Sequence, residues 1–200
     1  MSELGYSSII HIVGLGGAGT NVVENFLKNE KTIELLDSSA TRLSLMAMDI
    51  ADPDIKSLDE TYGKIQEQMR RKGIPQERVN LIAKSVKFPS AEAMFDFVQN
   101  KFKEHLLNEG VKLREYNPWL PSTVAIPPLA GGAGRRRSLA KAIYNLNYYQ
   151  LGIIKSFTNM FKDAALSSIH SPIILIIFGL GGGTGSGMVL DFARHLRQSV

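Results

Sequence analysis

The stretch IILIIFGLGGGTGSGM, residues 173–188, joins an apolar run to a glycine-rich loop and then to a helical pattern. Ile173 to Phe178 are consecutive apolar residues, mostly β-branched, which predicts a strand buried on both faces. From Met188 to Leu196, apolar residues return at helical spacing. A glycine loop between a strand and a helix turns backbone N–H groups and the positive end of the helix toward an anion. We therefore expect phosphate binding here, because a flexible, solvated linker would not join a buried strand directly to an apolar-faced helix.

A second unit of the same kind begins near the N-terminus. Ser8 to Val13 is predicted to be a buried strand, and the loop GLGGAGTN follows at residues 14–21, before another helical pattern. This loop contains the GxGxxG spacing found in nucleotide-binding folds. His11 lies inside the predicted strand, where we expect a packed histidine rather than a catalytic one.

A further strand is predicted over Leu43 to Ile50, and it ends in Asp49. An acidic residue at this point of a βαβ nucleotide fold contacts the ribose or the base edge. It can equally cap the following turn or helix. Both interpretations of Asp49 stay open, and capping is favoured for Asp52.

The middle of the chain differs in character and contains no catalytic constellation. We interpret residues 54–125 as an insertion or a lid-like subdomain. The elements expected in it are a polar helix over Ile55–Arg71, a short strand over Val79–Val86, an amphipathic helix over Ala91–Asn108 capped by Ser90, and a proline-rich connection over Asn117–Pro128.

A third glycine-rich loop, LAGGAG at residues 129–134, precedes Arg135, Arg136 and Arg137. A long helical pattern then runs from Ser138 to about Ile169, with a break expected near Gly152. The arginines could pair with phosphate oxygens or form a solvated basic face, and for the individual arginines the second interpretation is slightly favoured.

Composition limits the class of protein. The 200 residues, 44% of them apolar, can bury a sizeable core as one domain or as one domain with an insertion. The absence of cysteine excludes disulfides and cysteine-based metal or redox sites, and a net charge of +4 is too small to indicate nucleic acid binding. Without a signal-like segment or a long apolar run, we expect a cytoplasmic protein that does not insert into membranes. The sequence stops within a helical pattern, which suggests a fragment.

These units predict an α/β fold: a mostly parallel, Rossmann-like sheet with helices on both faces and the glycine loops gathered at the carboxyl ends of the strands. A nicotinamide enzyme would use Gly14, Gly16 and Gly19 with Asp49. It would leave Gly181–Gly187 without a role, and no catalytic His or Lys is evident. No Lys follows either loop as a P-loop NTPase requires, so that class is excluded.

The heptapeptide GGGTGSG at Gly181–Gly187 resembles the signature motif of the tubulin and FtsZ superfamily. GLGGAGTN at residues 14–21 is similar to the first loop of that family, and LAGGAGRRR at residues 129–137 to its third loop. The segment before the third loop is longer than in FtsZ, and the three arginines are not an FtsZ pattern. The resemblance therefore implies a divergent prokaryotic tubulin-like (FtsZ-like) GTP-binding domain, whose relatives polymerise head to tail into filaments.

The resemblance also implies a nucleotide site for GTP or GDP with Mg²⁺. Its expected contacts are Gly16, Gly17 and Ala18 on the phosphates, Asn21 near the guanine, Asp49 near the sugar, Gly132, Ala133 and Gly134 at the γ-phosphate, and Gly181, Gly182, Gly183, Thr184, Gly185 and Ser186 around the α- and β-phosphates.

The resemblance implies that residues 1–200 form the N-terminal nucleotide-binding domain. The family's base-stacking and ribose contacts and its hydrolytic acidic loop lie on later segments, in a C-terminal activation domain. No catalytic residue or protein metal ligand is assigned here, and hydrolysis would be completed by a neighbouring copy of the protein. A nicotinamide-dinucleotide enzyme and a non-hydrolysing nucleotide-binding scaffold are the alternatives.

Overall fold

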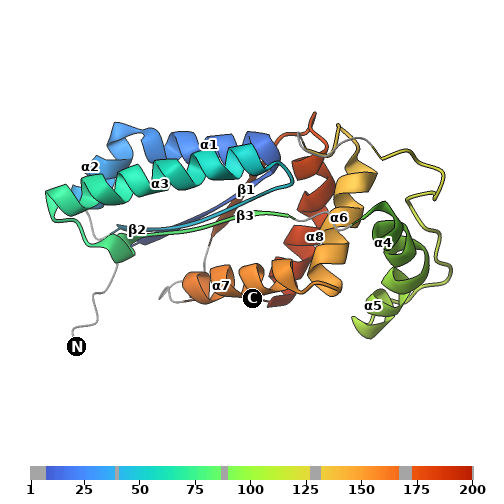
Figure 1. Ribbon diagram of the computed structural model, residues 1–200. Helices are drawn as coiled ribbons and strands as arrows, with labels where there is room; N and C mark the ends of the chain where they lie inside the picture. The colour runs from blue at the N-terminus through green and yellow to red at the C-terminus, as the bar shows by residue number, and fades with distance from the viewer. Residues whose placement is uncertain (1–7, 39–40, 87–89, 127–131, 167–172, 200) are drawn as a thin grey trace.

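The computed structural model describes residues 8–38, 41–86, 90–126, 132–166 and 173–199. Its centre is a parallel sheet with the strand order β3-β2-β1-β4 (Figure 1). Because all the strands run in one direction, their carboxyl ends lie at the same edge of the sheet. The strands are β1 (Ser8–Leu15), β2 (Thr41–Asp49), β3 (Val79–Ser85) and β4 (Ile174–Phe178).

Helices cover both faces of the sheet, which confirms the predicted α/β class. Alternate residues of β1 point to opposite sides, so that Ile12 packs in one core and Val13 in the other. Figure 1 shows α1, α2 and α3 along one face and α7 along the opposite face. The helices of these layers are α1 (Gly16–Lys28), α2 (Glu30–Ser38), α3 (Asp52–Lys72), α6 (Arg137–Tyr149), α7 (Ile153–Leu166) and α8 (Thr184–Ser199).

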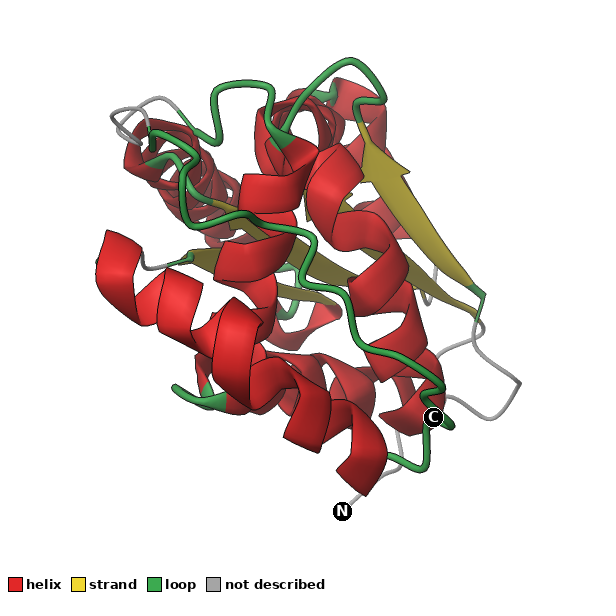
Figure 2. Ribbon diagram, turned by 90° about the vertical axis from the view of Figure 1, so that its right-hand side faces the viewer, coloured by secondary structure: helices red, strands yellow, loops and turns green. Residues whose placement is uncertain are grey.

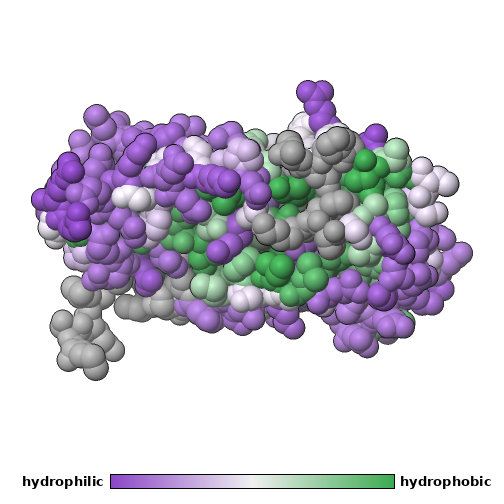
Figure 3. All heavy atoms as spheres, in the orientation of Figure 1, coloured by the Kyte–Doolittle hydropathy of each residue, from purple (hydrophilic) through white to green (hydrophobic). Residues whose placement is uncertain are grey.

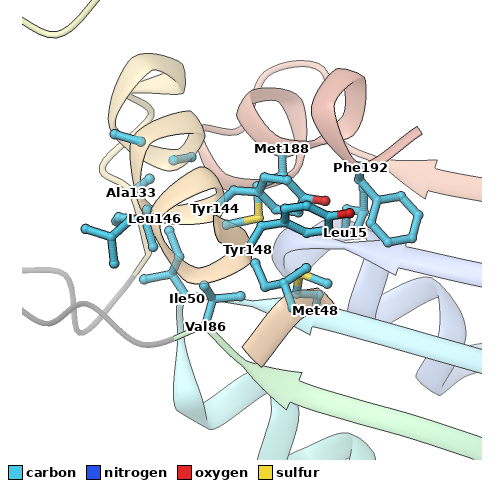
Figure 4. Close-up of a cluster of buried hydrophobic side chains, with 14 of the residues drawn as sticks. Leu15, Met48, Ile50, Val86, Ala133, Tyr144, Leu146, Tyr148, Met188 and Phe192 are labelled. Atoms are coloured by element: carbon cyan, nitrogen blue, oxygen red, sulfur yellow. The ribbon is translucent and has the colours of Figure 1, made fainter. Parts of the chain in front are cut away.

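The core below the carboxyl ends of the strands joins β1 and β2 to α6 and α8 (Figure 4). Tyr144 of α6, Phe192 of α8 and Leu15 of β1 are fully buried there. Burial of each such large apolar side chain stabilises the fold by roughly 1.5–3 kcal/mol. This packing fixes the starts of two helices relative to the strand ends on which the glycine loops stand.

The ends of α3 follow from its sequence. Asp52 and Asp54 lie in its first turn, where negative charge suits the helix dipole, and Pro53 is tolerated there because it lacks an N–H. Gly73 ends the helix with φ 71°, a left-handed conformation that glycine adopts without strain. The helix expected over Ile55–Arg71 is confirmed.

The long helical pattern after the third glycine loop forms two helices, α6 and α7. Gly152 lies between them with φ 65°, which places the break where it was expected. The predicted end near Ile169 lies outside the described residues.

A helical subdomain lies beyond the end of the sheet and packs against α6 (Figure 1). It comprises α4 (Ala91–Asp96), a π-helical turn η2 (Phe97–Lys101) and α5 (Phe102–Asn108). Ser90 caps α4, since its Oγ accepts a hydrogen bond from the N–H of Ala93 at 3.1 Å. The connection after α5 crosses the helices at this end of the molecule (Figure 2).

The segment that lies apart from the sheet is shorter than the insertion expected over residues 54–125. β3 pairs with β2, and α3 packs against α1 on the sheet, so both belong to the main layers. They join the fold because the short apolar run of β3 and the apolar face of α3 bury against β2. The part that lies apart from the sheet begins only at α4.

The prediction that Ile173–Phe178 is buried on both faces was wrong. In the described sheet β4 pairs only with β1 and forms an edge. Leu175 is 51% exposed, and Ile173, just before the strand, is 79% exposed. An apolar run indicates that a segment tends to be buried. It does not determine which strands pair with that segment, and this pairing sets whether the strand is central or at an edge.

On the face seen in Figure 3, the outer surfaces of α2 and α3 are hydrophilic, and apolar side chains gather in the band below them. Within the described part of the chain, no helix is long and apolar enough to cross a bilayer.

Candidate functional site

Three glycine loops meet around one cavity of about 410 Å³ at the carboxyl ends of the strands. This edge is where open α/β sheets bind their ligands. The lining comes from four places in the sequence: residues 15–18 where β1 ends and α1 begins, residues 132–135 before α6, Gly179 with residues 182–185 from the end of β4 into the first turn of α8, and Asp49, Ala51 and Asp54 where β2 ends and α3 begins.

The first and the last of the glycine loops are in direct backbone contact. Gly16 has φ 70°, and a Cβ added there would lie 2.6 Å from the backbone nitrogen of Gly185. A Cβ on Gly185 would in turn overlap the carbonyl oxygen of Leu15. Glycine is therefore required on both sides, because only bare backbone fits between the two loops.

The loop before α6 is attached by three contacts to residues 179–187, which we call the signature loop. A Cβ on Gly183 would lie 2.7 Å from the backbone nitrogen of Arg136. The N–H of Ala133 donates to Oγ1 of Thr184 at 3.3 Å, and the guanidinium of Arg137 donates to the carbonyl of Leu180 at 2.7 Å. The third loop thus has a fixed position beside the other two.

Two helices, α1 and α8, begin at this cavity, and α6 begins two residues after its lining residue Arg135. α1 starts at Gly16, α6 at Arg137 and α8 at Thr184, and none has an acidic residue in its first turn. The N-cap residues of α1 and α6 make no side-chain cap hydrogen bond. Each helix N-terminus carries roughly half a positive charge together with unsatisfied N–H donors. The cavity is therefore suited to an anion with several oxygen atoms, such as a phosphate chain.

Two carboxylates line the cavity beside the first turn of α1, since a Cβ added to Gly17 would lie 2.8 Å from Oδ2 of Asp54 and 3.6 Å from Oδ2 of Asp49. Asp49 is 2% exposed, and its Oδ1 accepts a hydrogen bond from the N–H of Ile50 at 2.7 Å. Burial is the main reason that the pKa of Asp49 rises to about 6. The neighbouring Asp54 acts in the same direction, and the N–H donors of Ile50 and Ala51 oppose it. The cavity therefore has acidic side chains close to the positive N-terminal end of α1.

Most of the residues predicted from the sequence line the cavity together. They are Gly16, Gly17, Ala18, Asp49, Gly132, Ala133, Gly134, Gly182, Gly183, Thr184 and Gly185. Asn21, Gly181 and Ser186 are not among the lining residues. Asn21 is exposed on α1, and the hydroxyl of Ser186 donates to the carbonyl of Gly182 within its own loop. Leu129, Ala130 and Gly131 lie outside the described residues.

Sequence reasoning missed Asp54 and treated Arg135 only as one of three arginines. The Asp-Pro-Asp run at residues 52–54 signals a helix start, and the first turn of a helix that follows a strand end is close to that end. That signal could have located Asp54 at the site. The sequence offers no comparable signal for Arg135.

Asp49 and Asp54 also bear on whether a metal ion could be held. Among the described residues, no group of three or more His, Asp or Glu side chains could hold a metal ion. Mg²⁺ that is bound to nucleotide phosphates needs only one or two protein carboxylates, because phosphate and water supply its other ligands. The donor set of Asp49 and Asp54 fits Mg²⁺ of that kind.

Comparison with known proteins places this site in a family. The chain matches, over residues 11–200, the family described as "Tubulin like". The chain belongs to this tubulin-like family. The match covers all the described lining residues and confirms the relationship to the tubulin and FtsZ superfamily indicated by the glycine motifs.

One similar solved structure is CetZ1 from Haloferax volcanii, described as a GDP-bound monomer. The two chains are 21% identical, the alignment covers 96% of this chain and 38% of CetZ1, and the TM-score is 0.44. This tubulin-like chain therefore spans well under half the length of CetZ1. No curated protein matches the chain.

Proposed function

We propose that the protein binds GTP and GDP in the cavity formed by its three glycine loops. The observation that carries this proposal is that the starts of α1 and α8, the turn before α6 and the bare backbone of Gly16, Gly183 and Gly185 meet at one cavity, in a chain of the tubulin-like family. A phosphate chain would accept hydrogen bonds from the N–H groups at the starts of α1 and α8 and in the turn before α6. Guanine is the base that the family relationship favours.

The use of all three loops favours this proposal over a nicotinamide enzyme. A dinucleotide would engage the β1–α1 loop and Asp49, and it would give no role to the loops at residues 132–135 and 182–185. Both of these loops line the same cavity as Gly16. A phosphate chain that extends along the cavity would engage all of them.

We also propose that Mg²⁺ accompanies the nucleotide, held by Asp49 and Asp54 together with phosphate oxygens. The ion would neutralise phosphate charge and relieve the repulsion between two neighbouring carboxylates. In this arrangement Asp49 and Asp54 hold the ion, and neither is assigned as the base for hydrolysis.

Residues 1–200 would then be the nucleotide-binding domain of a cytoskeletal protein that assembles head to tail into filaments. Among the described lining residues, the carboxylates are those of Asp49 and Asp54, which are assigned above to Mg²⁺. We therefore propose that a carboxylate of the neighbouring subunit positions the attacking water, as general-base catalysis requires.

Turnover of the full-length protein, measured at increasing concentration, tests this assembly-dependent activity. If hydrolysis is completed by a neighbour, GTP turnover per subunit rises steeply with concentration, and sedimentation detects assemblies over the same range. A non-hydrolysing scaffold would assemble with GTP and show no turnover at any concentration. Turnover per subunit that does not depend on concentration would contradict completion of the site by a neighbouring subunit.

A further inference from the structure

The three consecutive arginines before and at the start of α6 make different interactions. The guanidinium of Arg136 donates to the carbonyl of Ala125, in the connection that leads from the helical subdomain. The guanidinium of Arg137 donates to the carbonyl of Leu180, in the signature loop, at 2.7 Å. Both arginines therefore hold neighbouring backbone segments in place.

Arg135 differs from both, because it lines the cavity. Its side chain is exposed, and within the described residues its guanidinium has no hydrogen-bond or ion-pair partner. No other basic residue is found in the described lining of this cavity. The guanidinium is thus available to a ligand in a cavity whose other charged side chains, Asp49 and Asp54, are acidic.

The backbone of Arg135 is held in an unusual conformation. Its φ is 60°, and no other described residue except glycine has a positive φ. This turn packs closely against the signature loop, since a Cβ on Gly183 would lie 2.8 Å from the Cα of Arg135. A glycine would adopt this φ with less strain, so the arginine at this position is not explained by the turn itself.

The contacts along the cavity indicate which part of a phosphate chain Arg135 would meet. The starts of α1 and α8 are adjacent, so their N–H groups would bind the same inner phosphates. Thr184 is close to Gly16 of the first loop and also to Gly132 of the third loop. Arg135 belongs to the same turn as Gly132 and therefore lies on that side of Thr184. A phosphate chain that starts at the α1–α8 junction and continues past Thr184 would therefore end near Arg135.

We propose that Arg135 binds the terminal phosphate of a bound nucleoside triphosphate and thereby distinguishes it from the diphosphate. This inference rests on the proposed function. A guanidinium presents paired N–H donors that match two oxygens of one phosphate, and such charge-assisted hydrogen bonds are about twice as strong as neutral ones. The diphosphate lacks the phosphate group that Arg135 would bind.

Calorimetric titration with a non-hydrolysable GTP analogue and with GDP tests the role of Arg135. The variant Arg135→Gly removes the guanidinium and suits φ 60°, so it keeps the melting temperature of the unliganded protein. We expect it to lose affinity for the analogue by about tenfold or more while its affinity for GDP changes by less than about threefold. Arg135→Lys, which keeps the charge without the planar fork, should lie between the wild type and Arg135→Gly.

The control is Arg71→Gln, which removes one positive charge at the exposed C-terminal end of α3 and leaves both affinities unchanged. An analogue-to-GDP affinity ratio in Arg135→Gly within about twofold of the wild-type ratio would overturn the assignment of Arg135, whether both affinities stay or both fall. If the wild type binds neither nucleotide, the proposed function itself fails, and the inference fails with it. These outcomes are distinguished by the wild-type titration alone.

Discussion

The α-carbon of Gly185 packs directly against the carbonyl oxygen of Leu15, with no space between them for a methyl group. Leu15 ends β1 and Gly185 lies in the first turn of α8, so this contact locks the first glycine loop to the signature loop. Two helix N-termini are thereby held side by side before any ligand arrives. Preorganisation of this kind reduces the conformational entropy lost on binding.

The substitution Gly185→Ala tests this contact. The added methyl group would overlap the backbone of Leu15, and the separation of the two loops should lower the free energy of unfolding by about 1–3 kcal/mol or more. Nucleotide binding should be lost as well. Gly63→Ala is the matched control, because Gly63 lies within α3 with no atom within 4 Å of an added Cβ. That control should stabilise the protein by roughly 0.5–1 kcal/mol. Equal effects of the two substitutions in chemical denaturation would contradict the account.

The double variant Thr184→Val, Ser186→Ala separates nucleotide binding from folding. Thr184 Oγ1 accepts the hydrogen bond from the Ala133 N–H, and Ser186 donates to the carbonyl of Gly182, so their removal loosens both glycine loops. We expect weaker nucleotide affinity with a native circular dichroism spectrum and a loss of about 1 kcal/mol per hydrogen bond. Unchanged affinity in calorimetry would show that this loop does not hold the phosphates.

The variant Asp49→Asn tests the acidic side of the cavity through its pH dependence. Since the pKa of Asp49 is raised to about 6 in the folded protein, folding favours the protonated form. That contribution is present at low pH and is lost as the pH rises through about 6, reaching a cost of up to about 3 kcal/mol above that pH. Asparagine avoids this cost. In urea denaturation, the free energy of unfolding of the variant should therefore rise relative to that of the wild type by about 1 kcal/mol or more between about pH 5 and about pH 8.

The control for this experiment is Asp96→Asn. The pKa of Asp96 is lowered by hydrogen bonds from Asn100 and Lys101, so its substitution gives no gain of that sign. A difference between Asp49→Asn and the wild type that stays constant with pH would contradict a raised pKa at Asp49.

The attachment of the helical subdomain to α8 can be measured with a double-mutant cycle. Glu109, at the end of α5, accepts hydrogen bonds from Arg194 of α8 at 2.5 Å and from the hydroxyl of Tyr149 at 2.7 Å. Both charged side chains are partly buried, so Glu109→Gln with Arg194→Met should give a coupling energy of about 1–2 kcal/mol. The exposed pair Asp96–Lys101 in the same subdomain is the control and should couple far more weakly. Equal coupling of the two pairs would contradict a structural role for Glu109.

Local patterns predicted the strand–loop–helix units well. The apolar runs of β1 and β2, the glycine loops after β1 and β4, and the break at Gly152 were each predicted from neighbouring residues. These features depend on backbone freedom and on burial tendency, which adjacent residues determine. The convergence of the loops followed from the parallel direction of the strands.

Features that depend on distant contacts could not be predicted in the same way. The edge position of β4 depends on strand pairing, and no local pattern encodes it. The three arginines are adjacent in the sequence, and nothing local distinguishes them. Arg136 and Arg137 find their partners in the carbonyl groups of Ala125 and Leu180, which the fold brings close. Arg135 lines the cavity. The presence of Asp54 beside Asp49 depends on how the start of α3 turns past the end of β2.

Isothermal titration of the protein with GTP, ATP and NAD measures the nucleotide preference on which the assignment of the cavity depends. We predict that GTP binds most tightly, with a stoichiometry of one per chain, and that Gly185→Ala abolishes this binding. Tightest binding of NAD, retained in Gly185→Ala, would contradict it.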